Sequence, residues 1–269
     1  MRLADKIAIV VGAGQGPGEG LGNGRATALL FARNGAKVLA VDRNLDSAKE
    51  TAAIATEDGG ECVPFEADVT REATLQAAVE AAVKRWGRID ILHNNVGVSL
   101  AGGDASPLEI TEDAFDRVSA INLRGTVMAC KHTLPVMRQQ RSGAIVNIAS
   151  VAATIAFPSI AVYSGTKSAV DRMMRVAAME AGKLGFGVRV NCIYPGLIPT
   201  DMGMQLANDI VKVGLAPDVN AAVGSVVGQT PLGRLAEVGD IGTAAVFLCS
   251  NDARFITGIG LPVDGGMGM

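Results

Sequence analysis

The chain has 269 residues, of which 49% are hydrophobic, and its 24 basic and 27 acidic side chains give a net charge of −3. This length suits one α/β domain, or two small ones, and is enough for a large core. The near-even charge and the lack of a basic block argue against nucleic acid as a partner.

The chain offers few metal ligands. Its four cysteines form no CxxC pair and are accompanied only by His93 and His132, so we expect no metal site. The cysteines are expected to be reduced core residues. No signal-peptide region precedes the first strand, and no apolar run reaches the ~18 residues that a membrane helix needs. We therefore predict a cytoplasmic protein without a membrane anchor.

Apolar, β-branched runs alternate with helical patterns along most of the chain. Near-continuous apolar strands, each followed by a helix, predict a parallel sheet that is covered on both faces. We expect an α/β protein with a single-domain Rossmann fold over residues 1–269, its doubly wound parallel sheet of about seven strands flanked by helices. The predicted strands are Ile7–Val11, Lys37–Val41, Cys62–Glu66, Ile89–His93, Gly143–Ile148, Val188–Ile193 and Gly260–Val263. The predicted helices are 25–34, 45–57, 71–86, 111–139, 163–184 and 238–250.

A glycine-rich loop joins the first predicted strand to the first helix, with glycine at every second position of Gly12–Gly24. Strand, glycine loop and helix together are typical of a dinucleotide-binding site. Glycine lets the backbone turn sharply and approach a pyrophosphate, whose negative charge then meets the N–H groups at the helix start. A merely flexible loop is the alternative, and the flanking elements favour cofactor binding.

This loop holds more glycines than the fingerprint needs. If Gly16–Gly18 were its last pair, three glycines would fall inside the helix, each costing ~1 kcal/mol relative to Ala. With Gly22–Gly24 as the last pair, the helix starts at Arg25 and 15–21 becomes an insertion of unassigned role. Its sheet-facing positions are then Ala28, Leu29 and Ala32. The loop residues expected to approach the cofactor are Gly12, Asn23 and Gly24.

Acidic side chains follow the second and third predicted strands. Asp42 lies about 20 residues beyond the glycine loop, where an acid accepts hydrogen bonds from the adenosine ribose. Its carboxylate repels a 2′-phosphate, which favours NAD over NADP, although Arg43 beside it could meet that phosphate. A solvated loop acid is the alternative. Asp68, with Val69, is expected to contact adenine, to cap the next helix, or to do both, and Thr70 is the other candidate for the N-cap.

Asparagine and glycine follow the fourth predicted strand, in Asn94–Gly97. Turn chemistry alone explains this composition, and a close approach of Asn95 and Gly97 to a cofactor is the functional interpretation. His93 lies in the apolar run before them and is expected to be a core residue.

Three further polar side chains suggest acid/base chemistry. Ser150 ends the fifth predicted strand, and Tyr163 and Lys167 are at i and i+4, on one face of the next helix. A free tyrosine titrates near 10, and a cation beside it favours the phenolate and lowers its pKa. Tyrosine and lysine thus form a plausible acid/base pair, with Ser150 holding a substrate oxygen. An unremarkable surface pair is the alternative for this common spacing.

With these motifs in order, the chain resembles the short-chain dehydrogenase/reductase family nearly from end to end, from Lys6 to the last glycines. Two departures stand within the motifs: Val11 replaces the usual Thr before the first glycine, and Val96 the usual Ala. The matching motifs are the glycine loop, Asp68-Val69, Asn94-Asn95-Val96-Gly97, Asn122, Ser150, Tyr163-x-x-x-Lys167 and Pro195-Gly196.

This resemblance implies roles for individual residues. Tyr163 would be the general acid/base, Lys167 would lower its pKa and bind the nicotinamide ribose, and Ser150 would orient the substrate oxygen. Asn122 would hold a water of the proton relay, from a kinked helix. The nicotinamide loop would carry the remaining cofactor contacts, at Pro195, Gly196, Ile198 and Thr200.

The segment around 200–233 is where this family places its substrate lid. Its methionines and aliphatic residues indicate an apolar, adaptable pocket, with a helix packing its apolar face as the alternative. Pro262 cannot donate to a strand ladder, so the last strand should lie at a sheet edge. By analogy we expect a homotetramer. The predicted substrate contacts are Ser150, Ala152, Tyr163 and Met202.

We therefore predict an NAD-dependent oxidoreductase that interconverts a secondary alcohol and a ketone on an apolar substrate, cyclic ones included. An NADP-dependent reductase of 3-oxoacyl thioesters is the first alternative. A non-catalytic dinucleotide-sensing protein on the same fold is the alternative from another class. The presence of Asn122, Ser150, Tyr163 and Lys167 together argues against that last possibility.

Overall fold

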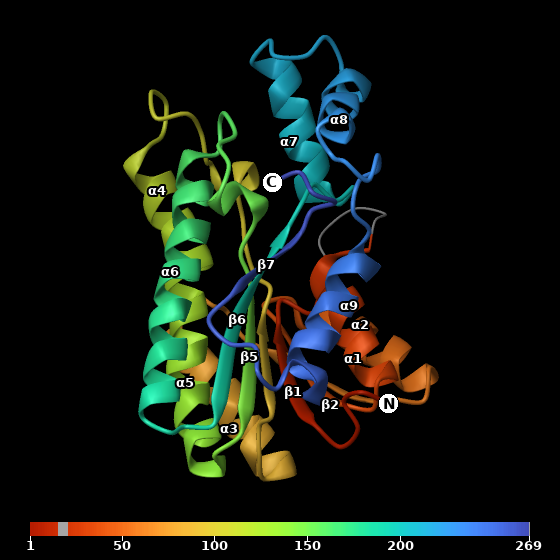
Figure 1. Cartoon of the computed structure of the whole chain (residues 1–269), viewed down its shortest axis with the longest axis vertical. Helices are drawn as coiled ribbons and strands as arrows, with labels where there is room; N and C mark the ends of the chain where they lie inside the picture. Colours follow the sequence, from red (N-terminus) through yellow and green to blue (C-terminus); the bar gives the residue numbers. More distant parts are fainter. Residues whose placement is uncertain (16–20, 269) are drawn as a thin grey trace.

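The computed structural model describes residues 1–15 and 21–268. Seven parallel strands form one sheet in the order β3-β2-β1-β4-β5-β6-β7, between two layers of helices (Figure 1). This is the predicted doubly wound Rossmann sheet, in a single domain. The chain reverses its direction of winding between β1 and β4, which is where such sheets bind ligands. The strands are β1 Ile7–Val11, β2 Lys37–Asp42, β3 Glu61–Glu66, β4 Ile91–Asn94, β5 Gly143–Ile148, β6 Val188–Pro195 and β7 Gly260–Val263.

Three strands have the predicted bounds and the others differ by a few residues at their ends. β4 begins two residues later than predicted; just before it, the Asp90 side chain accepts from the N–H of Ile7 at 2.9 Å and the Asp90 N–H donates to the Ile7 carbonyl at 2.8 Å. β6 runs on to Pro195 because its last four residues pair with β7. Since β7 is the outermost strand, the prediction that Pro262 marks a sheet edge is confirmed.

Each face of the sheet has its own hydrophobic core. Along β1, Ala8 and Val10 belong to one core and Ile9 and Val11 to the other, as the two-residue period of a strand requires. Helices α1, α2 and α9 cover the first face, and α3, α5 and α6 cover the second (Figure 1). The α-helices are α1 Asn23–Arg33, α2 Leu45–Glu57, α3 Glu72–Trp86, α4 Glu112–Ser119, α5 Gly125–Gln140, α6 Ala161–Lys183, α7 Asp201–Lys212, α8 Val219–Gly228 and α9 Val238–Cys249.

The single helix predicted over 111–139 is divided. A π-helical turn, η2 (Ala120–Arg124), joins α4 to α5. Such turns put one extra residue into the helix and are frequent at functional sites. The expected irregularity at Asn122 therefore takes the form of this turn.

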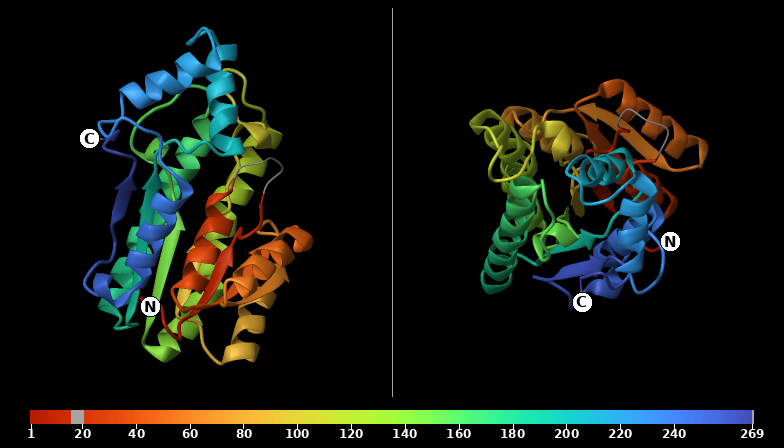
Figure 2. Two further views of the ribbon diagram at one scale, coloured as in Figure 1. Left: turned by 90° about the vertical axis from the view of Figure 1, so that its right-hand side faces the viewer. Right: turned by 90° about the horizontal axis from the view of Figure 1, so that it is seen from above.

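The segment predicted as a lid consists of two helices, α7 and α8, which lie beyond the carboxyl ends of the strands (Figure 2). Helix α7 faces the short helix η1 (Leu100–Gly102) of the loop after β4. From the sequence, a helix that packs its apolar face was only the alternative for this segment, and the structure has two helices there. Within the part of the chain that the structure describes, every helix is too short or too polar to cross a membrane.

Candidate active site

The glycine loop brings β1 and α1 into backbone contact. Gly12 adopts φ +82°, and a Cβ on Gly24 would lie 1.7 Å from the Gly12 carbonyl oxygen. Only glycine therefore allows this approach of helix and strand. Helix α1 begins at Asn23, with Gly22 at its N-cap. The register with Gly22–Gly24 at the helix start is thus confirmed, while the predicted start at Arg25 is two residues late because Gly24 packs inside the first turn.

The start of α1 has no side-chain cap. Its N-cap residue, Gly22, has no side chain with which to cap the first turn, and Asn23 stands at the first helical position. The sheet-facing residues of α1 are Ala28, Leu29 and Ala32, as predicted, and all three are buried in the core. Of the insertion at 15–21, residues 16–20 lie outside the described residues.

Asp42 is bonded to the glycine loop. One carboxylate oxygen accepts from the backbone N–H of Gly14 at 2.9 Å, and the other accepts from the N–H of Asn44 at 2.9 Å. Each oxygen keeps a second lone pair for another donor. Arg43 is exposed beside it.

Arg25 makes a network that the sequence did not reveal. Its guanidinium is 8% exposed and donates to Thr51 at 2.9 Å and to the Ser47 hydroxyl at 3.1 Å. These two α2 side chains in turn meet the glycine loop, Thr51 at the Ala13 carbonyl and Ser47 at the backbone of Gln15. The loop is therefore held from α2. The only sequence signal was an arginine on an otherwise apolar helix face.

Asp68 bonds within its own loop. One carboxylate oxygen accepts from the Thr70 backbone at 2.9 Å and from the Thr70 hydroxyl at 2.7 Å. Burial raises the pKa of Asp68, but these bonds and the charges of Arg71 and Arg43 outweigh it, so its pKa is lowered. The prediction that Asp68 caps α3 is wrong, because the N-cap residue is Arg71. Val69 lies against Gly125, at the start of α5.

Beyond β4, the backbone passes close to the glycine loop and to α6. The Asn95 side chain donates to the Gly12 carbonyl at 3.3 Å, and a Cβ on Gly97 would lie 3.1 Å from Nζ of Lys167. Val96 lies against Gly12, where a Cβ would be 2.7 Å from its methyl group. Val96, the bulkier departure from the family pattern, therefore depends on the glycine opposite it.

His93 is a core residue, as predicted. Its side chain is 0% exposed and packs edge-on against Phe31. Burial lowers the pKa of His93 to about 4. Neither ring nitrogen has a hydrogen-bond partner among the described residues.

Lys167 lies at the base of the candidate site. It is 2% exposed, and its ammonium donates to the Ile148 carbonyl at 2.7 Å, at the end of β5. The same nitrogen lies 5.6 Å from the centre of the Tyr163 ring, so the pair expected from its spacing does face the same side of α6. Burial lowers the pKa of Lys167 to about 8.

Ser150 and Tyr163 meet across the site. Burial raises the pKa of Tyr163, and a hydrogen bond with Ser150 lowers it by less, so its pKa is raised overall. Lys167 is not among the causes of this shift in the chain alone, and the lowering of the Tyr163 pKa by Lys167 stays a prediction. Ser150 is 9% exposed and also accepts from the N–H of Ala152 at 3.1 Å.

Asn122 is fully buried in the π-helical turn. Its amide oxygen accepts from the N–H of Val98 at 2.8 Å, and its amide nitrogen donates to the Val98 carbonyl at 2.9 Å and to Thr166 at 3.1 Å. Thr166 donates to the carbonyl of Tyr163 at 2.8 Å. Asn122 thus joins the loop after β4 to the helix that carries Tyr163. Its role toward a water stays a prediction.

The loop after β6 is pinned at Gly196 and Thr200. A Cβ on Gly196 would lie 2.9 Å from Cα of Asp264, so this loop packs on the C-terminal segment. Thr200 is the N-cap of α7, and its N–H bonds to the Ile198 carbonyl at 2.7 Å. Pro195 ends β6, so the four predicted nicotinamide-loop residues form one continuous turn into α7.

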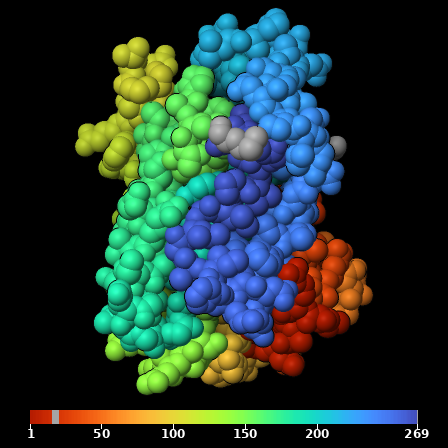
Figure 3. All heavy atoms as spheres, in the orientation of Figure 1, coloured from red at the N-terminus to blue at the C-terminus, as the bar shows by residue number. Residues whose placement is uncertain are grey.

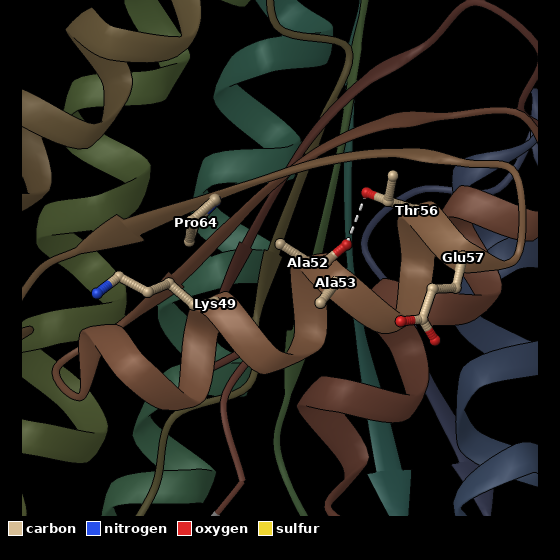
Figure 4. A pocket seen from close by; sticks show the side chains of 6 residues that line it. All are labelled: Lys49, Ala52, Ala53, Thr56, Glu57 and Pro64. Carbon is tan, nitrogen blue, oxygen red and sulfur yellow. Dashed lines mark hydrogen bonds between the residues drawn. The ribbon is translucent and has the colours of Figure 1, made fainter.

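Two surface hollows differ in their relation to this site. One of about 330 Å³ lies between η1 and α7 and is lined by Leu100, Ala101, Gln205, Asn208, Asp209 and Lys212. The other, about 460 Å³, lies between α2 and β3 (Figure 4) and is lined by Lys49, Ala52, Ala53, Thr56, Glu57 and Pro64. Of these two hollows, only the one beside η1 adjoins the predicted lid, because α7 lines it. Helix α7 also carries Met202, which is 37% exposed.

Comparisons with known proteins agree with this arrangement. Residues 19–268 match the family model described as enoyl-(acyl carrier protein) reductase. The chain is 36% identical over 267 residues to 2-(S)-hydroxypropyl-CoM dehydrogenase 3 of Xanthobacter autotrophicus, covering 99% of this chain and 98% of that one. It is 37% identical over 265 residues to D-threitol dehydrogenase of Mycolicibacterium smegmatis, covering 98% and 94%. The solved structure of NAD⁺-bound xylitol dehydrogenase matches with a TM-score of 0.91 at 31% identity, covering 99% and 100%.

The fold and these relatives define an enzyme, an oxidoreductase that acts on alcohols or ketones with a nicotinamide dinucleotide. The chain belongs to the short-chain dehydrogenase/reductase family. The expected family and fold are thereby confirmed.

Proposed function

We propose that this protein is an NAD-dependent dehydrogenase of secondary alcohols, with Tyr163 as its general acid/base. One observation carries the proposal: the Lys167 ammonium lies 5.6 Å from the centre of the Tyr163 ring at the carboxyl end of β5, and Ser150 is near enough to the phenol to lower its pKa. Three such groups around one point suit proton transfer to or from a substrate oxygen.

The residues present fit a nicotinamide dinucleotide. Gly12 and Gly24 leave no room for a Cβ where strand meets helix, and α1 starts there without a side-chain cap. The pyrophosphate would meet those N–H groups. Asp42 has free lone pairs to accept from ribose hydroxyls, which favours NAD over NADP. The other proposed cofactor contacts are Asn23, Arg43, Asp68, Val69, Asn95, Gly97, Tyr163, Lys167, Pro195, Gly196, Ile198 and Thr200.

Each residue of the site then has a defined task. Ser150 orients the alcohol oxygen, and Tyr163 accepts the proton of that hydroxyl. A bound NAD⁺ would supply the hydride acceptor and one more positive charge in the site. That charge is needed because burial raises the pKa of Tyr163 in the chain alone. The Lys167 ammonium faces the Tyr163 ring, and Asn122 bonds to Val98 in the loop after β4.

We propose an apolar substrate, cyclic ones included. Helix α7 carries Met202, Met204, Leu206, Ile210 and Val211 among polar residues, and Ala152 and Met202 belong to η3 (Val151–Ala153) and α7. The names of the relatives refer to a hydroxypropyl thioether and a tetritol. Both contain secondary alcohols, which supports the reaction class more than the apolar preference.

The proposed assembly is a homotetramer. Helix α6 exposes three apolar side chains, Met173 at 42%, Val176 at 53% and Met179 at 62%. This helix and the C-terminal segment lie side by side on one face of the molecule (Figure 3). Exposed apolar side chains at helical spacing are typical of subunit contacts. Light scattering should give about four times the 27.6 kDa of one chain, and a monomeric mass would contradict the assembly. The cytoplasmic location stays a prediction.

A second candidate is an NADP-dependent reductase of 3-oxoacyl thioesters. Two observations favour it: the description of the matching family model, and the exposed Arg43, whose charge reaches Asp68 and could meet a 2′-phosphate. A non-catalytic dinucleotide sensor is disfavoured because it would not need the convergence of Ser150, Tyr163 and Lys167.

A screen of secondary alcohols with NAD⁺ or NADP⁺, followed by nicotinamide absorbance, tests the proposal. We expect turnover of apolar alcohols with NAD⁺ and a loss of roughly 10³-fold in kcat for Tyr163→Phe, because the proton acceptor is gone. A preference for NADPH and a 3-oxoacyl thioester would establish the second candidate. Unchanged turnover of Tyr163→Phe would refute the acid/base assignment.

A further inference from the structure

A buried carboxylate caps the helix that carries Tyr163. Asp104 follows η1 in the loop after β4 and is 5% exposed. One of its oxygens accepts from the N–H of Val162 at 3.1 Å, and the other accepts from the N–H of Tyr163 itself at 2.8 Å. The first oxygen also accepts from Ala105 at 3.0 Å.

This cap replaces one that the helix lacks. The N-cap residue of α6 is Ile160, whose side chain cannot accept a hydrogen bond. The remaining N–H of the first turn, that of Ala161, bonds to the Ala105 carbonyl at 3.5 Å. All three N–H groups that have no partner within α6 are therefore met by Asp104 and Ala105. The helix is capped by a loop 58 and 59 residues earlier in the chain.

The same loop is held at its other end by the candidate site. Asn122 bonds to both backbone groups of Val98, at 2.8 and 2.9 Å, and Gly97 lies against Lys167. Between these points the loop is tied to α4 through Arg117, which donates to the Gly102 carbonyl at 3.2 Å. The loop is thus fixed from Asn122 at one end to the backbone of Tyr163 at the other.

We infer that Asp104 is a positioning residue, which sets the place of the Tyr163 phenol relative to Ser150. This inference rests on the proposed function. The phenol branches from a backbone whose N–H is held by Asp104, so loss of that bond moves the start of α6 and the hydroxyl with it. A displacement of about 1 Å at a reacting group can cost up to 10²-fold in rate.

Asp104→Ala and Asp104→Asn test the inference, with Thr111→Ala as the matched control. Thr111 also caps a helix, α4, by accepting from Ala114 at 3.2 Å, and it lies outside the site. Asn keeps one acceptor oxygen and loses the other, so it should restore part of the activity. The readouts are kcat, KM for the alcohol, the Kd of NADH by fluorescence, and Tm.

For Asp104→Ala we expect a loss of about 30-fold in kcat, with KM and Kd within about 3-fold, since the proton acceptor moves while the cofactor site stays. Asp104→Asn should lose about 5-fold. Thr111→Ala should lower Tm by a comparable amount but keep kcat within about 2-fold, as an ordinary cap does. If Asp104→Ala does not fold, Asp104→Asn against Thr111→Ala decides.

Equal kcat losses in the Asp104 and Thr111 variants at equal Tm shifts would overturn the inference, because Asp104 would then only stabilise the fold. Tyr163→Phe, assayed in the same series, distinguishes failure of the Asp104 inference from failure of the proposed function. If it is inactive while the Asp104 variants behave like the control, the inference alone fails. If Tyr163→Phe retains turnover, the proposed function fails with it.

Discussion

The two sides of the candidate site are held in different ways. On the glycine-loop side, backbone approaches backbone: a Cβ on Gly24 would lie 1.7 Å from the Gly12 carbonyl oxygen, and one on Gly14 would lie 2.7 Å from the Asp42 carboxylate. This side depends on the absence of side chains. A side chain introduced at these glycines should therefore clash with the neighbouring backbone or carboxylate.

On the α6 side, buried side chains set the distances. Lys167 bonds to the Ile148 carbonyl at 2.7 Å, and Asn122 and Asp104 anchor the loop after β4. Substitutions there should act by removal of a bond. Variants on the glycine-loop side should therefore bind the cofactor more weakly, whereas variants on the α6 side should have a lower kcat.

After Tyr163→Phe, the largest effect is expected at Lys167. Lys167→Ala removes a cation buried beneath the Tyr163 ring and leaves the Ile148 carbonyl without its donor, so kcat should fall by roughly 10²-fold or more. Stopped-flow or steady-state kinetics with NAD⁺ measures it. Lys183→Ala, at the exposed end of the same helix, is the control. A kcat within twofold of the parent would contradict the assignment of turnover to this side.

A cofactor-side defect is expected for Gly24→Ala. Its Cβ has no room against Gly12, so the start of α1 must move away from the strand, and the Kd of NADH should rise by roughly 10- to 100-fold, the equivalent of a 1–3 kcal/mol overpacking strain. Fluorescence titration measures it. In Gly182→Ala, a helical glycine with open space around its Cβ, binding should be unchanged. Unaltered NADH binding by Gly24→Ala would contradict the assignment of Gly22–Gly24 as the last glycine pair of the loop.

A smaller change is expected for Asp42→Ser. Serine cannot accept from Gly14 and a ribose as a carboxylate does, and it no longer repels a 2′-phosphate, so the ratio of NAD⁺ to NADP⁺ in kcat/KM should fall by roughly 10-fold. Parallel assays with both cofactors give the ratio, with Glu57→Gln on the far end of α2 as the control. A ratio that does not change would leave Asp42 only a structural role.

The smallest effect on activity is expected at His93, which lies in the core beneath both sides. Its pKa is lowered from 6.5 to about 4, so the unfolded chain binds more protons between those values. The free energy of unfolding should therefore fall as the pH drops from 6.5 to 4, by about 3 kcal/mol from this residue. His93→Phe should remove that dependence in urea titrations, whereas His132→Gln should not. Equal slopes for His93→Phe and the parent would contradict it.

The glycine side was largely predictable. A glycine pattern between a strand and a helix reports a close backbone approach, and the cost of interior glycine selected the Gly22–Gly24 register. The helix start was misplaced by two residues because packing of Gly24 on Gly12, rather than helix propensity, decides it.

The α6 side was only partly predictable. Tyr163 and Lys167 are neighbours on one helix, so their spacing alone places them on one face. The sequence does not show the burial of Tyr163, which raises its pKa by more than the hydrogen bond with Ser150 lowers it in the chain alone. Asp104 gave no signal as a cap, since its partners lie 58 and 59 residues away.

By itself the sequence determined the order of strands and helices, the glycine loop and the residue types of the site, because local spacing and propensity encode them. Only the tertiary structure decided that Asp104 and Ser150 meet Tyr163, that Asn122 bonds to Val98 and Thr166, and that α2 holds the glycine loop through Arg25. Those contacts join segments far apart in the chain. Their hydrogen bonds form only once sheet packing has brought the segments together and excluded water from between them.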